Sequence, residues 1–286
     1  MGVPNRFILH QGRVIAAMGR VALGSLFGGK QAPPELPGPE RHEILPPRAP
    51  DLVRHYVKLV GGDPAAYRRT LPPHLFPQWG FPIAMQTLVG LDVPLSRGLN
   101  AGCSLRVNAP LPQGEPLEVR SRLERVDDDG RRVVLEVRVI TGTASAPNAL
   151  EGLMAVVVPL KKGDGKKERP TVPASAREIS FRRLGADMGL AYAKLTGDFN
   201  PVHWVPAYAR ASGFSNCILH GFATMAIAME ALDKAVFAGQ PLASIEVRFT
   251  RPLVLPAAVG VYVENDHLWV GDAPGGRAYL TGHFTA

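Results

Sequence analysis

The chain has 286 residues, of which 46% are hydrophobic and 20% are charged. This composition is typical of a globular protein with a sizeable core and excludes a disordered chain. The formal net charge of +7 favours acidic partners, such as phosphorylated small molecules or acidic carrier proteins. A nucleic-acid partner is not expected, because no basic stripe is interleaved with aromatic residues.

The N-terminal segment has the pattern of a basic amphipathic helix. In RFILHQGRVIAAMGRVALGSLFGG, the residues Arg6, His10, Arg13 and Arg20 fall on nearly one helical face. The arginines interrupt any secretory signal, and no run of 18 uncharged apolar residues predicts a transmembrane span. We expect the helix to dock on the protein's own surface. A transit peptide and weak contact of residues 1–30 with a membrane surface are the alternatives.

Two linker-like stretches divide the chain. QAPPELPGPERHEILPPRAP (31–50) is rich in proline, and KKGDGKKERPTVPAS (161–175) is charged and has no hydrophobic periodicity. The sequence therefore predicts four parts: an N-terminal extension and connector (1–44), a first unit (45–160), a charged linker (161–175) and a second unit (176–286).

The two units resemble each other. YVKLVGGDPAAY (56–67) matches YAKLTGDFNPVH (192–203) without gaps over Tyr, Lys, Leu and Gly, and QWGFPIAMQTLVGL (78–91) parallels LHGFATMAIAMEAL (219–232). A third match pairs SLRVNAPLPQGEPLEVRSRL with SIEVRFTRPLVLPAAVGVYV. Three matches in the same order predict a duplicated, pseudo-symmetric fold.

Each unit has the same predicted elements. A helix ends at a glycine, Gly197 in the second unit, and an irregular stretch leads to an apolar helix that begins at Gly221 and ends at Leu232. Alternating strands follow: ASIEVRFTRPLVL, AAVGVYVEND, HLWVGDA and RAYLTGHFTA. A helix that is apolar nearly all round must be surrounded by protein. We expect an α+β fold in which a curved antiparallel sheet wraps a long helix; two βαβ domains are disfavoured, because the strands come in consecutive runs.

The nine residues LTGDFNPVH (195–203) concentrate the polar chemistry of the second unit. Asn200 and Pro201 suit the cap and first position of a short helix, so capping explains part of the motif. Capping does not explain Asp198 together with His203, which can hold a water molecule and move its protons without a metal ion. The ungapped match places Tyr67 opposite His203, so the pair is predicted in one unit only.

ILHGFATM supplies a complement to this pair. The backbone N–H of Gly221 at the start of the apolar helix can hold a developing oxyanion, although close packing of helix against sheet explains the glycine equally well. We expect His220 to be a structural histidine. Cys103 and Cys217 stand far apart in apolar surroundings, which predicts buried thiols and a reducing, cytoplasmic compartment.

The stretch YAKLTGDFNPVHWVPAYARASGFSNCILHGFATM resembles the signature of the MaoC-like (R)-specific enoyl-CoA hydratases, or hydratase 2. VRFTRPLVLP resembles the strand that follows in that family, and the duplication is similar to its double hot dog members. The resemblance covers residues 45–286. It implies a double hot dog fold, a hydro-lyase of fatty acid metabolism, and a first unit that is degenerate and gives room to the acyl chain.

The resemblance also implies roles for single residues. Asp198 and His203 would activate the water that adds to a trans-2-enoyl thioester and would protonate the neighbouring carbon, with Asn200 positioning them. The Gly221 N–H would stabilise the thioester oxygen. Gly197, Phe222 and Arg248 are the predicted substrate-binding residues, Arg248 as a candidate for the phosphates of CoA.

Several alternatives stay open at the level of the sequence. The substrate is an acyl-CoA or an acyl-carrier-protein thioester, and no metal or redox cofactor is expected. A dehydratase working on a carrier protein, a hot dog thioesterase and a non-catalytic acyl-binding module are the rival functions. The protein is expected to be a monomer or a homodimer.

Overall fold

The computed structural model describes residues 2–17, 19, 35–161, 169–237 and 239–286. Arg20 and parts of both linkers, residues 31–34 and 162–168, lie outside the described residues. No helix in the described part of the chain is long and apolar enough to cross a membrane.

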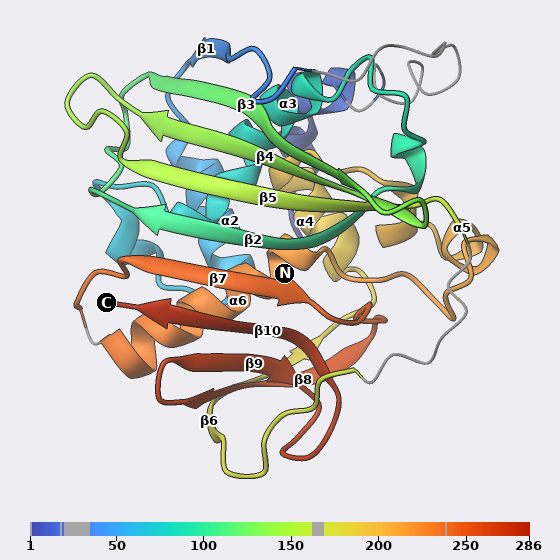
Figure 1. The fold of residues 1–286 in the computed structure, drawn as a ribbon. Coiled ribbons are helices and arrows are strands. Elements are labelled where there is room, and N and C mark those ends of the chain that lie inside the picture. Colours follow the sequence, from blue (N-terminus) through green and yellow to red (C-terminus); the bar gives the residue numbers. More distant parts are fainter. Residues whose placement is uncertain (1, 18, 20–34, 162–168, 238) are drawn as a thin grey trace.

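One antiparallel sheet of ten strands forms a layer with the principal helices against one face (Figure 1). The strand order is β1-β3-β4-β5-β2-β7-β10-β9-β8-β6, and every pair is antiparallel. The strands are β1 (Arg41–Leu45), β2 (Leu99–Val107), β3 (Leu117–Asp128), β4 (Arg132–Gly142), β5 (Leu150–Pro159), β6 (Arg177–Leu184), β7 (Ser244–Phe249), β8 (Ala257–Glu264), β9 (His267–Gly271) and β10 (Ala278–Thr285).

The helical elements lie between the strands in the same order in both halves. The first half carries α2 (Pro50–Val60), η2 (Pro64–Tyr67), η3 (Pro73–Leu75), α3 (Pro77–Thr87) and η4 (Leu95–Arg97). The second half carries α4 (Met188–Thr196), η5 (Pro201–His203), α5 (Pro206–Ala211), α6 (Gly221–Leu232) and the π-helical turn η6 (Asp233–Phe237). The N-terminal η1 (Asn5–Gln11) continues as a helix over residues 12–17.

The two halves meet at the β2–β7 pair in the middle of the sheet. The register runs from Gly102 opposite Arg248 to Arg106 opposite Ser244. A Cβ atom at Gly102 would lie 2.4 Å from the carbonyl oxygen of Val247, so glycine permits this close approach. The sheet is therefore continuous across the two halves.

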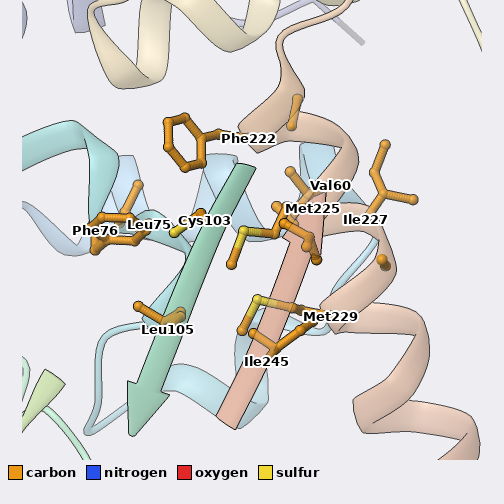
Figure 2. Close-up of a cluster of buried hydrophobic side chains, with 14 of the residues drawn as sticks. Val60, Leu75, Phe76, Cys103, Leu105, Phe222, Met225, Ile227, Met229 and Ile245 are labelled. Carbon is orange, nitrogen blue, oxygen red and sulfur yellow. The ribbon is translucent and has the colours of Figure 1, made fainter. Parts of the chain in front are cut away.

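The core lies between this sheet and the two central helices, α3 and α6. In α6 every residue after Gly221 is buried, as expected for a helix that is apolar all round. Figure 2 shows Met225 and Met229 of α6 beside Cys103 of β2 and Ile245 of β7. Cys103 is a free, buried thiol, and its burial raises its pKa. The prediction of a buried small hydrophobe is confirmed for Cys103, as it is for the buried Cys217.

Matching hydrogen bonds confirm that the halves are structural copies. Leu71 N–H donates to the carbonyl of Leu111 at 2.8 Å, and Leu219 N–H donates to that of Leu253 at 2.8 Å. In each half, the bond joins the segment that precedes the central helix, α3 or α6, to the loop that follows the middle strand, β2 or β7. The duplication seen in the sequence thus extends to main-chain contacts.

The helix caps correct the predicted alignment of residues 56–67 with residues 192–203. Gly61 and Gly197 both end their helices in the left-handed conformation, with φ of 94° and 86°. Asp63 then caps η2 before a proline, as Asn200 caps η5 before Pro201. The second half therefore has one additional residue between helix end and cap. The ungapped pairing of Tyr67 with His203 was wrong by one position, because the chain lengthens at Asp198.

Candidate active site

The motif at residues 195–203 folds by local capping. Gly197 closes α4 with its N–H bonded to the carbonyl of Ala193. Asn200 Oδ1 accepts a hydrogen bond from Val202 N–H at 3.3 Å, and Pro201 occupies the first position of η5. Asn200 N–H in turn donates to Asp198 Oδ1 at 3.3 Å. These turns confirm the capping prediction and hold the Asp198 carboxylate beside the turn that carries His203.

Asp198, His203 and His220 form one cluster. One ligand-type atom from each, a carboxylate oxygen or a ring nitrogen, lies within 4.8 Å of the other two. Asp198 and His203 are partly exposed, whereas His220 is buried. The structure thus brings together the predicted acid/base residues, and His220, which the sequence predicted to be structural, lies beside them.

Hydrogen bonds determine which ring nitrogens carry protons. His203 Nδ1 lies 2.8 Å from the carbonyl oxygen of Ile218, so Nδ1 donates and Nε2 of the neutral ring is free to accept a proton. His220 Nε2 lies 2.9 Å from the backbone oxygen of Asp198 and donates to it. His220 therefore holds the main chain of Asp198 in place, and His203 presents a basic nitrogen.

His220 is kept neutral by its surroundings. Burial is the main cause that lowers the pKa of His220 to about 3, and the stacked His203 imidazole further disfavours a second proton at this position. The ring of His220 stacks on that of His203, with centroids 3.6 Å apart and planes inclined by 25°. The ring of Tyr192 also contacts the His220 ring, with a centroid distance of 4.8 Å. Burial raises the pKa of the Tyr192 hydroxyl, and the Asp198 charge adds to the effect.

The cluster has the residue types of a metal site but not the orientation. Imidazole lone pairs lie in the ring plane, and two nearly parallel stacked rings do not aim them at one point. A single ion bound by both histidines would require one ring to turn. The arrangement fits proton transfer better than coordination.

The remaining predicted residues are distributed differently. Gly221 begins α6, and among the described residues no group accepts a hydrogen bond from its N–H. A Cβ atom there would lie 2.9 Å from the ring of Phe249, so close packing also requires glycine. Phe222, 7% exposed, packs edge-on to Phe76 and Phe249 near Asp198.

Arg248 is not brought to the cluster. It lies on β7 between Val247, which is buried against the helices, and Phe249, and its side chain is 79% exposed beside Glu246. Successive side chains of a strand point to opposite faces, so Arg248 lies on the sheet face away from α6.

The N-terminal segment contributes a wall that the sequence did not predict. The side chain of Val14 occupies the space that a Cβ atom on Gly197 would need, with Val14 Cβ at 2.6 Å. Buried residues at positions 7, 11, 14 and 17 have helical spacing, and this spacing is the signal that could have revealed docking next to the site.

Comparisons with known proteins identify a family domain in the second half. Residues 163–272 match the MaoC like domain. The chain is 25% identical over 197 residues to 3-hydroxyacyl-thioester dehydratase X of Mycobacterium tuberculosis, a match that spans 66% of this chain and 68% of that protein. It is 26% identical over 178 residues to the peroxisomal enoyl-CoA hydratase 2 of Arabidopsis thaliana, spanning 54% of this chain and 56% of the relative.

Solved structures show the same fold. The crystal structure of HtdX from Mycobacterium tuberculosis superposes with a TM-score of 0.71 at 24% identity, covering 86% of this chain and 99% of that one. A conserved hypothetical protein of the same organism, described as a double hotdog fold, superposes with a TM-score of 0.60 at 14% identity, covering 87% of this chain and 96% of that one. The chain therefore has the double hot dog fold and contains a MaoC-like domain in its second half.

Proposed function

We propose that this protein catalyses the reversible hydration of trans-2-enoyl thioesters to (R)-3-hydroxyacyl thioesters, with Asp198 and His203 as the acid/base pair. The observation that carries the proposal is the convergence of the Asp198 carboxylate and the His203 ring within 4.8 Å, in a MaoC-like domain. The names of the relatives, a 3-hydroxyacyl-thioester dehydratase and an enoyl-CoA hydratase 2, support both directions of the reaction.

The proposed chemistry needs only groups of this chain and a water molecule. His203 Nε2 and the Asp198 carboxylate hold the water, and one of them removes its proton as the oxygen bonds to C3. The electron pair of the double bond moves toward the thioester oxygen, which accepts a hydrogen bond from Gly221 N–H. The proton taken from the water is then delivered to C2, so that the OH and H of one water molecule are both added and the pair returns to its starting state. Asn200 positions Asp198 through its N–H.

The carrier of the acyl group is proposed to be CoA or the phosphopantetheine of a carrier protein. Both carry negative charge, which suits the net charge of +7. We propose that no metal ion or redox cofactor takes part, so activity is expected to survive chelation with EDTA.

The test is the hydration of trans-2-enoyl-CoA thioesters, followed by loss of the conjugated thioester absorbance. Asp198→Asn and His203→Ala are each expected to lower kcat/KM by about 10²- to 10⁴-fold, and the wild type should yield the (R)-alcohol. The double variant should lose little more than the worse single variant, because the two groups act as a unit.

Asp63→Asn is the matched control. Asp63 is the first-half counterpart of Asn200 and caps η2 through Ala65 N–H. Asparagine retains this cap, so the control should keep wild-type activity. An active Asp198→Asn or His203→Ala enzyme would refute the assignment of the pair. Turnover of acyl-carrier-protein thioesters alone would select the carrier-protein dehydratase.

A further inference from the structure

The N-terminal segment, residues 5–17, is built into the site although it lies outside the MaoC-like domain. Its buried side consists of Phe7, Gln11, Val14 and Ala17, whereas Ile15 is 42% exposed. The segment therefore docks through one face, as the sequence predicted for residues 2–17.

Gln11 anchors this segment to the end of α4. Its side chain is completely buried, and its Nε2 donates to the carbonyls of Lys194 and Leu195 at 3.2 and 3.1 Å. Its Oε1 accepts a hydrogen bond from Gln78 of α3 at 3.2 Å. The anchor thus ties together one helix from each half and satisfies α4 carbonyls that would otherwise lack partners.

Val14 lies one turn beyond Gln11 and faces the catalytic groups. It lines a cavity of about 10 Å³ together with Pro77, Phe81 and Phe222, and Asp198 lies on the same wall. Such a volume holds roughly one water molecule. Tyr192 and Thr196 complete the lining, and apart from Asp198 the remaining side chains that close it are apolar.

The position of this cavity suits it to take the acyl tail of the proposed thioester substrate. The CoA or carrier portion is large and polar and must remain toward solvent, where the Asp198 side chain is 28% exposed. The acyl tail must then extend to the apolar side, where Val14 and Phe222 meet. With Val14 in place, space for only a short chain remains.

We propose that Val14, held by the Gln11 anchor, closes the acyl end of the pocket and limits the enzyme to short-chain enoyl thioesters. This inference rests on the proposed function. Val14 is then a specificity-determining residue contributed by a segment outside the catalytic half.

The test compares Val14→Ala with Ile15→Ala. Each removes apolar carbon from neighbouring positions of one helix, but only the first faces the cavity. Wild type and Ile15→Ala should prefer the four-carbon trans-2-enoyl-CoA. Val14→Ala should raise the ratio of kcat/KM for the six-carbon over the four-carbon substrate by about 15-fold, since each newly buried methylene contributes roughly fourfold.

Gln11→Ala provides a second route, because it loosens the anchor without touching the cavity. It should shift the same ratio in the same direction, and circular dichroism would verify that each variant is folded. An unchanged ratio in both Val14→Ala and Gln11→Ala would overturn the inference, as would an equal shift in Ile15→Ala.

Binding separates this inference from the proposed function. Calorimetric titration of Asp198→Asn, with and without Val14→Ala, measures the same two enoyl-CoA thioesters without turnover. A 15-fold shift in relative Kd with no turnover by the wild type would support the role of Val14 and refute the hydratase. No shift in Kd, or no binding by either protein, would overturn the role of Val14.

Discussion

Gly189 of α4 lies so close to the turn that carries His203 that adding one methyl group at Gly189 should displace this turn and lower the proposed activity. A Cβ atom at this position would lie 1.9 Å from the carbonyl oxygen of His203 and 2.9 Å from its carbonyl carbon, whereas real Cβ contacts are at least 3.0 Å. Gly189→Ala therefore forces the turn to move by about 1.1 Å or α4 to tilt away. The equivalent position of the first half, within the helix that ends at Gly61, holds Val53, where no acid/base residue of the proposed pair has to be positioned.

The expected effect on catalysis is larger than the effect on stability. A displacement of about 1 Å of a catalytic group costs roughly 10²-fold in rate, so kcat for enoyl-CoA hydration should fall about 100-fold. Overpacking costs about 1–3 kcal/mol, offset by up to about 1 kcal/mol of helix propensity. The net loss of about 1–2 kcal/mol should lower Tm by roughly 2–8 °C in a chain of this size.

The assay is steady-state hydration beside a thermal melt. Gly12→Ala is the control, since Gly12 is also helical and a Cβ atom there would meet nothing within 4 Å. It should retain full activity and equal or greater stability. A Gly189→Ala enzyme with wild-type kcat would show that the His203 turn need not be held as the structure has it.

Two further predictions concern buried polar groups. The pKa of His220 is lowered to about 3 in the folded protein, so His220 binds a proton more readily in the unfolded chain. The free energy of unfolding should therefore fall as the pH drops from about 6.5 toward 3. In urea titrations at several pH values, His220→Gln should show a weaker pH dependence than the wild type, and an unchanged dependence would contradict the prediction. His74 Nε2 and Glu230 Oε1 form a buried pair at 3.0 Å, so His74→Leu should lower the free energy of unfolding by about 3–5 kcal/mol. His74→Leu with Glu230→Leu should recover part of that loss, and a double variant no more stable than the single one would argue against an unpaired charge as the cause.

The local parts of the site could be predicted because they depend on neighbouring residues. Gly197, Asn200 and Pro201 have strong conformational preferences, so the helix end and the cap follow from the sequence alone. Asp198 and His203 are five positions apart across these turns, which leaves little freedom in their separation. The burial of α6 could likewise be predicted, because the helix is apolar nearly all round.

The long-range parts could not be predicted in this way. Glu230 and His74 meet across 156 positions, and Gln11 reaches the carbonyls of α4 across more than 180. Nothing in local periodicity identifies such partners. Arg248 is a different case: along β7 the buried Ile245 and Val247 alternate with Glu246 and Arg248, so local alternation already places Arg248 on the outer face.

The β2–β7 pairing gives the first half a structural role that does not depend on catalysis. An isolated second half would present β7 as an open edge, with unpaired backbone groups available to other chains, and would leave Glu230 without His74. Because both halves share one polypeptide, every catalytic half is supplied with one scaffold at high effective concentration. Under the proposed function, the first half can therefore lack an acid/base pair and still be required for the fold of the second half.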